Sequence, residues 1–349
     1  MYTVLIVMVV YIHSYYLEAQ QYNVALFLQN FTGTKGVGRT ANYLFFCISG
    51  YLFARNIKNI NDVWTKMKKR WCTLLLPYLL WNLIFVLWYV VLENVPGVSG
   101  FNNSSGIVEK YWEQPILESL YDLFIAPAAF QLWFLRDLLV MLVFTPILWW
   151  IAKRQWMVSL IMALCSTIFY PWLIYFWLGI IIAVVGLVFI SPICYALGAT
   201  GQLIAVQKWD IEDYYRPKWA IAVSSIIFVG YAVYLALGNK SFIIYEVPVN
   251  LLGLYLLWSF YDMFARGRCF ANRGLWKYIC GYSFFIYCFH EPAFNIIKKL
   301  ALTIYGTSEK VLIFFYLINP WIMVAIAVIT AKMLQRMTPR IYKTLTGGR

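Results

Sequence analysis

The stretch Val4–Tyr15, VLIVMVVYIHSY, is an apolar run that is interrupted by one imidazole, His13. The second histidine of the chain, His290, lies in another apolar run, IYCFHEP, so both histidines belong to sequence that suits a hydrocarbon environment. Ionisable side chains are costly inside a membrane and mark candidate functional sites there. The first run therefore predicts a membrane helix that carries a candidate functional residue.

The composition points to the same class of protein. Hydrophobic residues make up 62% of the 349 residues and charged residues only 12%, far from the averages of soluble domains. The formal net charge of +13 comes from basic residues that flank apolar runs. The positive-inside rule explains that pattern, whereas nucleic-acid binding needs one basic patch, so we expect a lipid bilayer and no nucleic acid as partner.

The apolar runs predict an all-α, polytopic bundle of about ten spans, since each span needs roughly 20 mostly apolar residues. No internal repeat or separate soluble domain is visible, so residues 1–349 are expected to form one domain. Pro171 and Pro192 interrupt the longest apolar region, where we expect two spans, one of them tilted or broken. The expected spans are Met1–Leu17, Thr40–Ala54, Trp71–Leu92, Gln131–Ile151, Trp156–Leu173, a run within Ile174–Gln207, Trp219–Leu237, Phe242–Phe264, Tyr278–Ile297 and Val311–Met333.

The basic residues give an orientation to this bundle. Of the 28 Lys and Arg residues, 20 fall between spans on one side and seven on the other, which predicts that both termini are cytoplasmic. No basic segment precedes the first run and no clear cleavage site follows it, so we expect it to remain as a signal anchor. The segments expected in the cytoplasm are Arg55–Arg70, Lys153–Arg154, Lys208–Lys218, Arg266–Lys277 and the tail from Lys332.

One segment on the outer side, Glu93–Phe130, is longer than a simple connection. Its second half has apolar residues at helical spacing opposite acidic ones, which predicts a short amphipathic helix at the membrane interface. Such a helix either seals the outer face or covers an outward-facing cavity. The apolar positions are Leu117, Leu120, Tyr121 and Phe124, and the acidic ones are Glu118 and Asp122.

The common catalytic motifs are absent from the sequence. It has no phosphate-binding loop, dinucleotide fingerprint, HExxH or GxSxG, and its seven cysteines form no CxxC pair. We therefore expect no metal site and no disulfide, and we read the cysteines as small apolar residues. Any chemistry must come from side chains within the spans.

The helix rise places the candidate residues in depth. Counted from the cytoplasmic side, His13 and His290 both lie about 18–20 Å deep at 1.5 Å per residue. Arg136 and Asp137 are expected a turn or so below the outer surface. Glu291 follows His290 directly, and neighbours on a helix diverge by about 100°. Arg136 or Asp137 is therefore the better expected partner for the histidine layer.

Each of these groups also has a structural explanation. An intramembrane histidine can tie two helices together, and Arg136 with Asp137 or Glu291 can form a structural ion pair. The convergence of two imidazoles, a guanidinium and carboxylates in spans that hold few other charges favours function. A neutral imidazole can take a proton from a hydroxyl at neutral pH, so this layer suits general-base chemistry.

Five blocks in order along the chain resemble the bacterial membrane acyltransferase family 3. They are VLIVMVVYIHS, LFFCISGYLFAR, KKRWCTLLLPYLLW, QLWFLRDLLV and GYSFFIYCFHEP. The resemblance implies a multi-pass plasma-membrane enzyme with ten spans and both ends inside. It also implies transfer of an acyl group, commonly acetyl, to sugars of cell-surface polysaccharides. One departure is that Tyr2 stands where the family usually has an arginine before the first-span histidine.

The resemblance assigns expected roles to particular residues. His13 is the expected general base or a transient acyl carrier, and Arg136 the group that holds the oxyanion or the acceptor. Arg70 is expected to pair with phosphates of an acyl-CoA donor, most simply acetyl-CoA, which is a co-substrate and not a bound cofactor. The remaining expected site residues are His290, in the catalytic set, and Ser283, Tyr287 and Glu291, in the substrate-binding set.

An alternative function is a transporter or export factor for a lipid-linked saccharide. Broken helices and charges near the bilayer midplane also mark translocation paths. Transporters often contain two corresponding halves, and this sequence shows no such symmetry.

Overall fold

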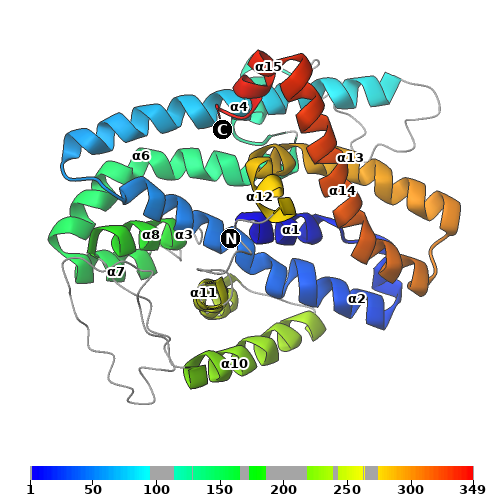
Figure 1. Ribbon diagram of the computed structural model, residues 1–349, viewed down its shortest axis with the longest axis horizontal. Helices are drawn as coiled ribbons and strands as arrows, with labels where there is room; N and C mark the ends of the chain where they lie inside the picture. The colour runs from blue at the N-terminus through cyan, green and yellow to red at the C-terminus, as the bar shows by residue number, and fades with distance from the viewer. Residues whose placement is uncertain are drawn as a thin grey trace.

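The computed structural model describes residues 2–94, 114–127, 129–165, 173–185, 218–238, 243–261, 263 and 274–348. Every regular element in these ranges is a helix, as the sequence predicted (Figure 1). The longer helices are α1 (Tyr2–His13), α3 (Thr40–Ala54), α4 (Ile60–Asn94), α6 (Trp133–Arg154), α8 (Leu173–Val185), α10 (Lys218–Leu237), α11 (Ile243–Phe260), α13 (Ser283–Tyr305) and α14 (Glu309–Met337). The shorter ones are η1 (Leu17–Gln21), α2 (Asn23–Gln29), η2 (Asn30–Thr34), η3 (Val37–Arg39), α5 (Ile116–Phe124), η6 (Phe130–Leu132), α7 (Trp156–Cys165), α12 (Gly274–Gly281) and α15 (Pro339–Leu345).

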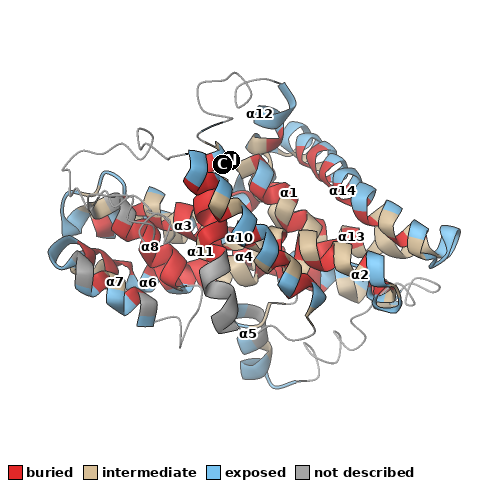
Figure 2. Cartoon of the chain, turned by 90° about the horizontal axis from the view of Figure 1, so that it is seen from below, coloured by how far each residue is buried: buried red, intermediate tan, exposed pale blue. Residues whose placement is uncertain are grey.

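Several helices have the character of membrane spans. Within the described ranges, four are long and apolar enough to cross a bilayer: α4, η6 with α6 (Phe130–Arg154), α10 and α14. Large apolar side chains are exposed on outward faces, for example Ile147 at 59% and Ile329 at 59%, while buried residues line the interior (Figure 2). Such outward apolar faces suit contact with lipid. The total number of spans and the side on which the termini lie stay predictions.

The helix α1 lies in the middle of the bundle. It packs against α3, α13 and α14 and against the short segment η2 (Figure 1). At η2 the chain approaches α1 so closely that a Cβ on Gly33 would meet the Tyr316 hydroxyl at 3.0 Å and the Tyr11 carbonyl at 3.2 Å. Its central place keeps His13 at 8% exposure.

The closest helix crossing joins α3 to α8. Gly50 of α3 faces Gly179 of α8, and a Cβ on either glycine would overlap the opposite main chain, at Phe176 and Cys47 respectively. Small residues allow membrane helices to approach in this way. The glycine of the quoted LFFCISGYLFAR block therefore has a packing role, which holds α3 and α8 together beside α1.

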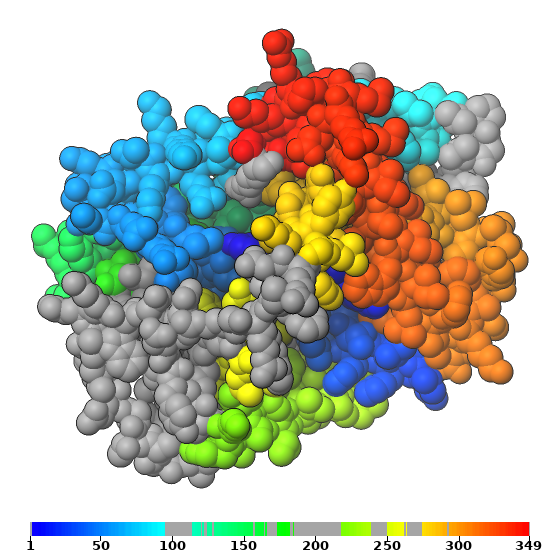
Figure 3. Space-filling view, in the orientation of Figure 1, coloured from blue at the N-terminus to red at the C-terminus, as the bar shows by residue number. Residues whose placement is uncertain are grey.

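The C-terminal helices cover one side of the bundle. The short α15 packs against α4, where the indole Nε1 of Trp81 donates a hydrogen bond to the carbonyl of Leu345 at 3.0 Å. The space-filling view shows these C-terminal residues, in red, packed directly against the light blue residues of α4 (Figure 3). This contact ties the C-terminal tail to the helix that carries Arg70.

The boundaries of several helices differ from the predicted ones; α1, for example, ends at His13 and not at Leu17. The helix α4 takes in the basic segment before the expected span, because that segment continues the helix from Ile60. The expected span Tyr278–Ile297 is divided at Tyr282 into α12 and α13, and α13 continues to Tyr305. Most of the predicted run within Ile174–Gln207, together with Pro171, Pro192 and the segments 208–217 and 266–273, lies outside the described residues.

Candidate active site

A narrow cavity of about 150 Å³ lies beside α1. Arg70 of α4 lines it together with Ser283 and Tyr287 of α13, so the structure brings together three of the four residues expected to bind substrate. Most of the other lining side chains are apolar, including Leu74, Phe134 and Leu138. The cavity is thus mainly apolar, with one guanidinium in its wall.

The face of α1 that lines this cavity also carries His13. Tyr2, Ile6 and Val9 line the cavity, and their spacing of four and three residues places them on one helix face. His13 is the next position on that face, at the end of α1. On α13, Tyr287 precedes His290 by three residues, and the centroids of their rings are 6.4 Å apart. Both helices therefore lead from the cavity to the histidines.

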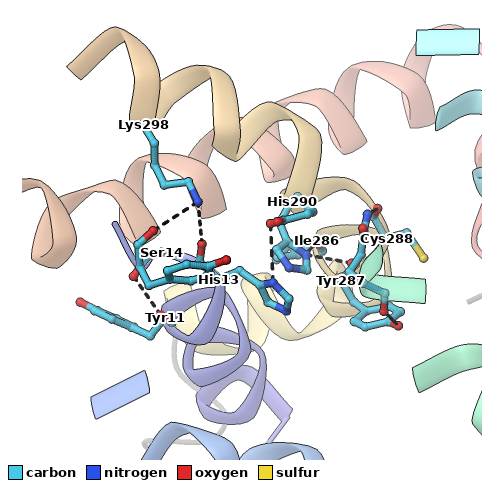
Figure 4. Close-up of polar contacts among 11 residues, drawn as sticks. Tyr11, His13, Ser14, Ile286, Tyr287, Cys288, His290 and Lys298 are labelled. Atoms are coloured by element: carbon cyan, nitrogen blue, oxygen red, sulfur yellow. Dashed lines mark hydrogen bonds and ion pairs between the residues drawn. The ribbon is translucent and has the colours of Figure 1, made fainter. Parts of the chain in front are cut away.

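His13 and His290 lie side by side, at the common depth that the helix rise predicts. Their ring centroids are 5.0 Å apart with an interplanar angle of 64°, and both rings are buried (Figure 4). Phe130, which precedes α6, packs edge-on against His13 with a centroid distance of 6.2 Å. The pair is therefore enclosed by α1, α13 and η6.

Glu291 is the carboxylate that reaches this pair. Its Oε2 lies 3.6 Å from Nδ1 of His13, across the interface between α13 and α1. The sequence argument preferred Arg136 or Asp137 to Glu291 as the partner of the histidine layer, and the contact of Glu291 with His13 contradicts that preference. A carboxylate reaches the histidines from Glu291, because the packing of α1 on α13 brings this residue to His13.

The ring of His290 is held in one orientation. Its Nδ1 lies 3.1 Å from the carbonyl of Ile286 and 2.9 Å from that of Tyr287. Carbonyl oxygens only accept hydrogen bonds, so in the neutral ring Nδ1 carries the proton and Nε2 carries the lone pair. Nε2 is buried and has no hydrogen-bond partner. The ring therefore presents an unsatisfied acceptor to the site.

Arg136 makes different contacts from those expected. Its Nε donates to Oδ1 of Asp137 at 2.8 Å, and its Nη1 donates to the carbonyl of Ile125, just after α5, at 2.7 Å. Neither histidine is among its hydrogen-bond partners. The expected pairing of Arg136 with the histidine layer is therefore wrong, because its side chain points toward the end of α5. Its catalytic role stays a prediction.

Lys298 is a site residue that the sequence argument missed. Its Nζ donates to the carbonyl of His13 at 3.1 Å (Figure 4) and to that of Tyr15 at 3.4 Å. It also lies over the rings of Tyr15 and Phe294. The sequence placed it in an outer loop, beyond a span that ended at Ile297. A signal existed, since Lys298 follows Glu291 by seven residues and so shares its helix face.

The basic cluster Lys66–Arg70, in the first part of α4, contains two kinds of residue. Lys66 donates to the carbonyl of Phe53 at 3.0 Å and also to that of Arg55, so it satisfies the end of α3. Arg70 lines the cavity instead. Of this cluster, Arg70 is the member that lines the cavity beside α1.

The chain is similar to known acyltransferases. A family model described as an acyltransferase domain, Acyl_transf_3, matches residues 3–331, which include both histidines and Lys298. The succinoglycan biosynthesis protein ExoH of Rhizobium meliloti (strain 1021) is 24% identical over 317 residues, covering 86% of this chain and 77% of the relative. No solved structure matches the chain.

Proposed function

We propose, from the premise that this chain belongs to the Acyl_transf_3 family of acyltransferases, that it moves an acyl group from acyl-CoA to a sugar hydroxyl of a polysaccharide. Family membership makes the chain an O-acyltransferase and favours an enzyme over the transporter alternative. The printed name of the relative, a succinoglycan biosynthesis protein, supports a polysaccharide acceptor. The observation that carries the proposal is the cavity lined by Arg70, whose walls on α1 and α13 belong to the same helices as the paired histidines.

The distance along α1 from the cavity to His13 suits a thioester with a long, thin arm. Tyr2 and His13 stand at the two ends of α1, which are about 16 Å apart at 1.5 Å per residue. An extended pantetheine arm has a similar length, and the apolar walls suit its methylene and methyl groups. Arg70 would pair with phosphates at the cavity mouth, because guanidinium groups bind phosphate through two parallel hydrogen bonds. Ser283 and Tyr287 would line the arm between the two ends.

The reaction needs one proton to move from the acceptor to the leaving group. An ionised Glu291, with Oε2 3.6 Å from Nδ1 of His13, would favour the tautomer that carries its proton on Nδ1. The lone pair on Nε2 is then free to accept the proton of the sugar hydroxyl. The sugar oxygen then bonds to the thioester carbon and the carbon–sulfur bond breaks. The imidazolium returns its proton to the leaving thiolate. Glu291 thus orients the base, in the manner of a catalytic triad.

The acceptor is proposed to enter from the side of α5. The side chain of Arg136 is 31% exposed there, which leaves part of its guanidinium available to a sugar or to the developing oxyanion. The donor would come from the cytoplasm, where acyl-CoA is made, and the polysaccharide from the opposite face of the plasma membrane. His290, whose Nε2 is unsatisfied, is placed to accept a hydrogen bond from the acceptor beside His13.

The experiment uses the full chain in lipid nanodiscs with radiolabelled acetyl-CoA and oligosaccharides prepared from bacterial exopolysaccharide. Label in the glycan, released by mild base as acetate, is the expected result and identifies an O-acyl ester. A His13→Ala variant is the control for transfer of label that does not need the proposed base. Intact protein that cleaves neither acetyl-CoA nor longer acyl-CoA with any acceptor would overturn the proposal.

A further inference from the structure

Three side chains at the end of α1 form a cluster of metal-ligating groups. One ligand atom each from His13, His290 and Glu291 lies within 4.8 Å of the other two. The cluster is enclosed: His290 is fully buried, and the side chains of His13 and Glu291 are 10% and 16% exposed. Two helices supply the groups, so the packing of α1 on α13 assembles the cluster.

The hydrogen bonding of these groups resembles that of a ligand set. Nδ1 of His290 is engaged by the carbonyls of Ile286 and Tyr287, as outer hydrogen bonds commonly fix metal-bound histidines, and Nε2 is buried without a partner and so is left to bind an ion. Oε2 of Glu291 is buried without a hydrogen-bond partner. Its separation of 3.6 Å from Nδ1 of His13 is close to the ligand spacing of about 3.4 Å that tetrahedral Zn²⁺ imposes.

We infer that His13, His290 and Glu291 bind a divalent transition-metal ion of the zinc class, and that the bound ion inhibits the enzyme. Two imidazole nitrogens and one carboxylate oxygen suit Zn²⁺ or Co²⁺, whereas Ca²⁺ and Mg²⁺ prefer oxygen ligands. Three protein ligands leave a fourth position for water or for a competing ligand. This inference departs from the expectation of no metal site, because His13 and Glu291 are 278 positions apart and no spacing motif connects them.

The charges at the site indicate an exchangeable ion. Glu291 is the one anionic ligand, and the ammonium of Lys298 lies on the carbonyl of His13, so a divalent ion would meet a nearby positive charge. An ion that stays bound permanently is usually held by more anionic ligands, which raise the affinity. The inhibition rests on the proposed function: a metal on Nδ1 of His13 displaces the proton that the charge of Glu291 holds there, and it occupies the space of the acceptor.

Direct metal binding can be measured without any enzymatic assay. The full chain, with its affinity tag removed, is stripped with a chelator in nanodiscs and titrated with CoCl₂ while the visible absorption is recorded. One equivalent of Co²⁺ with an intense tetrahedral spectrum, displaced by ZnCl₂, is the expected result. A spectrum that stays that of the aqueous ion would overturn the site.

Three substitutions locate the ion. Glu291→Gln and His290→Asn should each weaken Co²⁺ binding by more than about tenfold, because each removes one of three ligands. Lys298→Gln should tighten it by about tenfold, since a neighbouring positive charge is lost, while Lys299→Gln serves as the matched control with wild-type affinity. Unchanged binding in both ligand variants, with thermal unfolding like that of the wild type, would place the ion elsewhere and overturn the inference.

The inhibition is tested separately in the acyl-transfer assay. ZnCl₂ should abolish label transfer in the wild type, and a chelator should restore it. Cobalt binding without any transfer in chelator would reject the proposed function and keep the site. Transfer that ZnCl₂ does not reduce, in protein that binds cobalt as expected, would reject the inhibitory role.

Discussion

Lys298 donates a hydrogen bond to the main-chain carbonyl of His13, with 3.1 Å between Nζ and the oxygen. His13 ends α1, so its carbonyl is one of the acceptors that the helix itself leaves unsatisfied. A positive charge is favourable at this end of a helix. Lys298 therefore fixes the part of α1 that carries the proposed base, and acts as a positioning residue.

Substitution of Lys298 should affect the turnover number more than substrate affinity. In Lys298→Ala the end of α1 loses its cap, and misplacement of the base should lower kcat by about 10- to 100-fold with little change in KM. Lys298→Arg should recover more activity than Lys298→Gln, because it keeps a charged donor. The matched control is Lys299→Ala, measured in the same steady-state assay. Equal losses at positions 298 and 299 would contradict the positioning role.

The carboxylate of Glu291 should be needed for more than packing. Glu291→Gln keeps the shape of the side chain but removes the charge that orients His13, so we expect kcat to fall by about 100-fold. Single-turnover rates with bound acetyl-CoA measure the chemical step directly. Glu118→Gln, on the exposed face of α5, is the control for loss of a carboxylate. A Glu291→Gln variant with the wild-type rate would show that the contact to His13 is structural only.

Much of the fold follows from patterns within single helices. The predicted span Thr40–Ala54 coincides with α3, and the amphipathic spacing after Glu93 corresponds to α5. The side of α5 that carries Leu117 and Tyr121 is exposed, at 80% and 61%. Periodicity, composition and helix rise act locally, so the sequence alone predicts helices and the shared depth of residues on them.

The contacts between helices could not be predicted in the same way. The pairing of Glu291 with His13 depends on the direction in which α13 packs on α1, and no local pattern encodes that direction. Lys298 was missed because a span of ordinary length ended one residue earlier, although α13 continues to Tyr305. Adjacent positions on a helix diverge, which disfavours contact between their side chains. Arg136 nevertheless bonds to its neighbour Asp137, because its side chain is long enough to curl back.

Arg70 should govern the use of the acyl donor. Arg70→Ala removes the guanidinium from the cavity wall, so KM for acetyl-CoA should rise by about tenfold or more, as expected for a charge-assisted phosphate contact. Lys58→Ala removes a basic residue from the same segment and should leave KM unchanged. Equal, small effects of both substitutions would mean that Arg70 contributes only to membrane topology.

The orientation of the bundle can be tested with reporter fusions. The excess of basic residues on one side predicts that fusions after Lys153 and after Lys343 report the cytoplasm. A fusion within Asn102–Gly106 should report the opposite face. A cytoplasmic signal from Asn102–Gly106 would reverse the depth order of the histidines and move the donor side of the cavity to the outside.

The role of His13 separates clearly from its contribution to stability. Alanine is well tolerated in a membrane helix, and one lost polar contact there typically costs about 1 kcal/mol, so His13→Ala should still insert and accumulate. Loss of a general base lowers the rate by about 10²–10⁴-fold.

The effect of His290→Ala should be milder, because Nδ1 of His290 is engaged by main-chain carbonyls and the proposed task of this residue is to orient the acceptor. The measurement is acyl transfer per folded molecule, with accumulation followed in isolated membranes. A His13→Ala protein that accumulates normally and transfers acyl groups at the wild-type rate would make His13 a packing residue and move the catalytic assignment to His290.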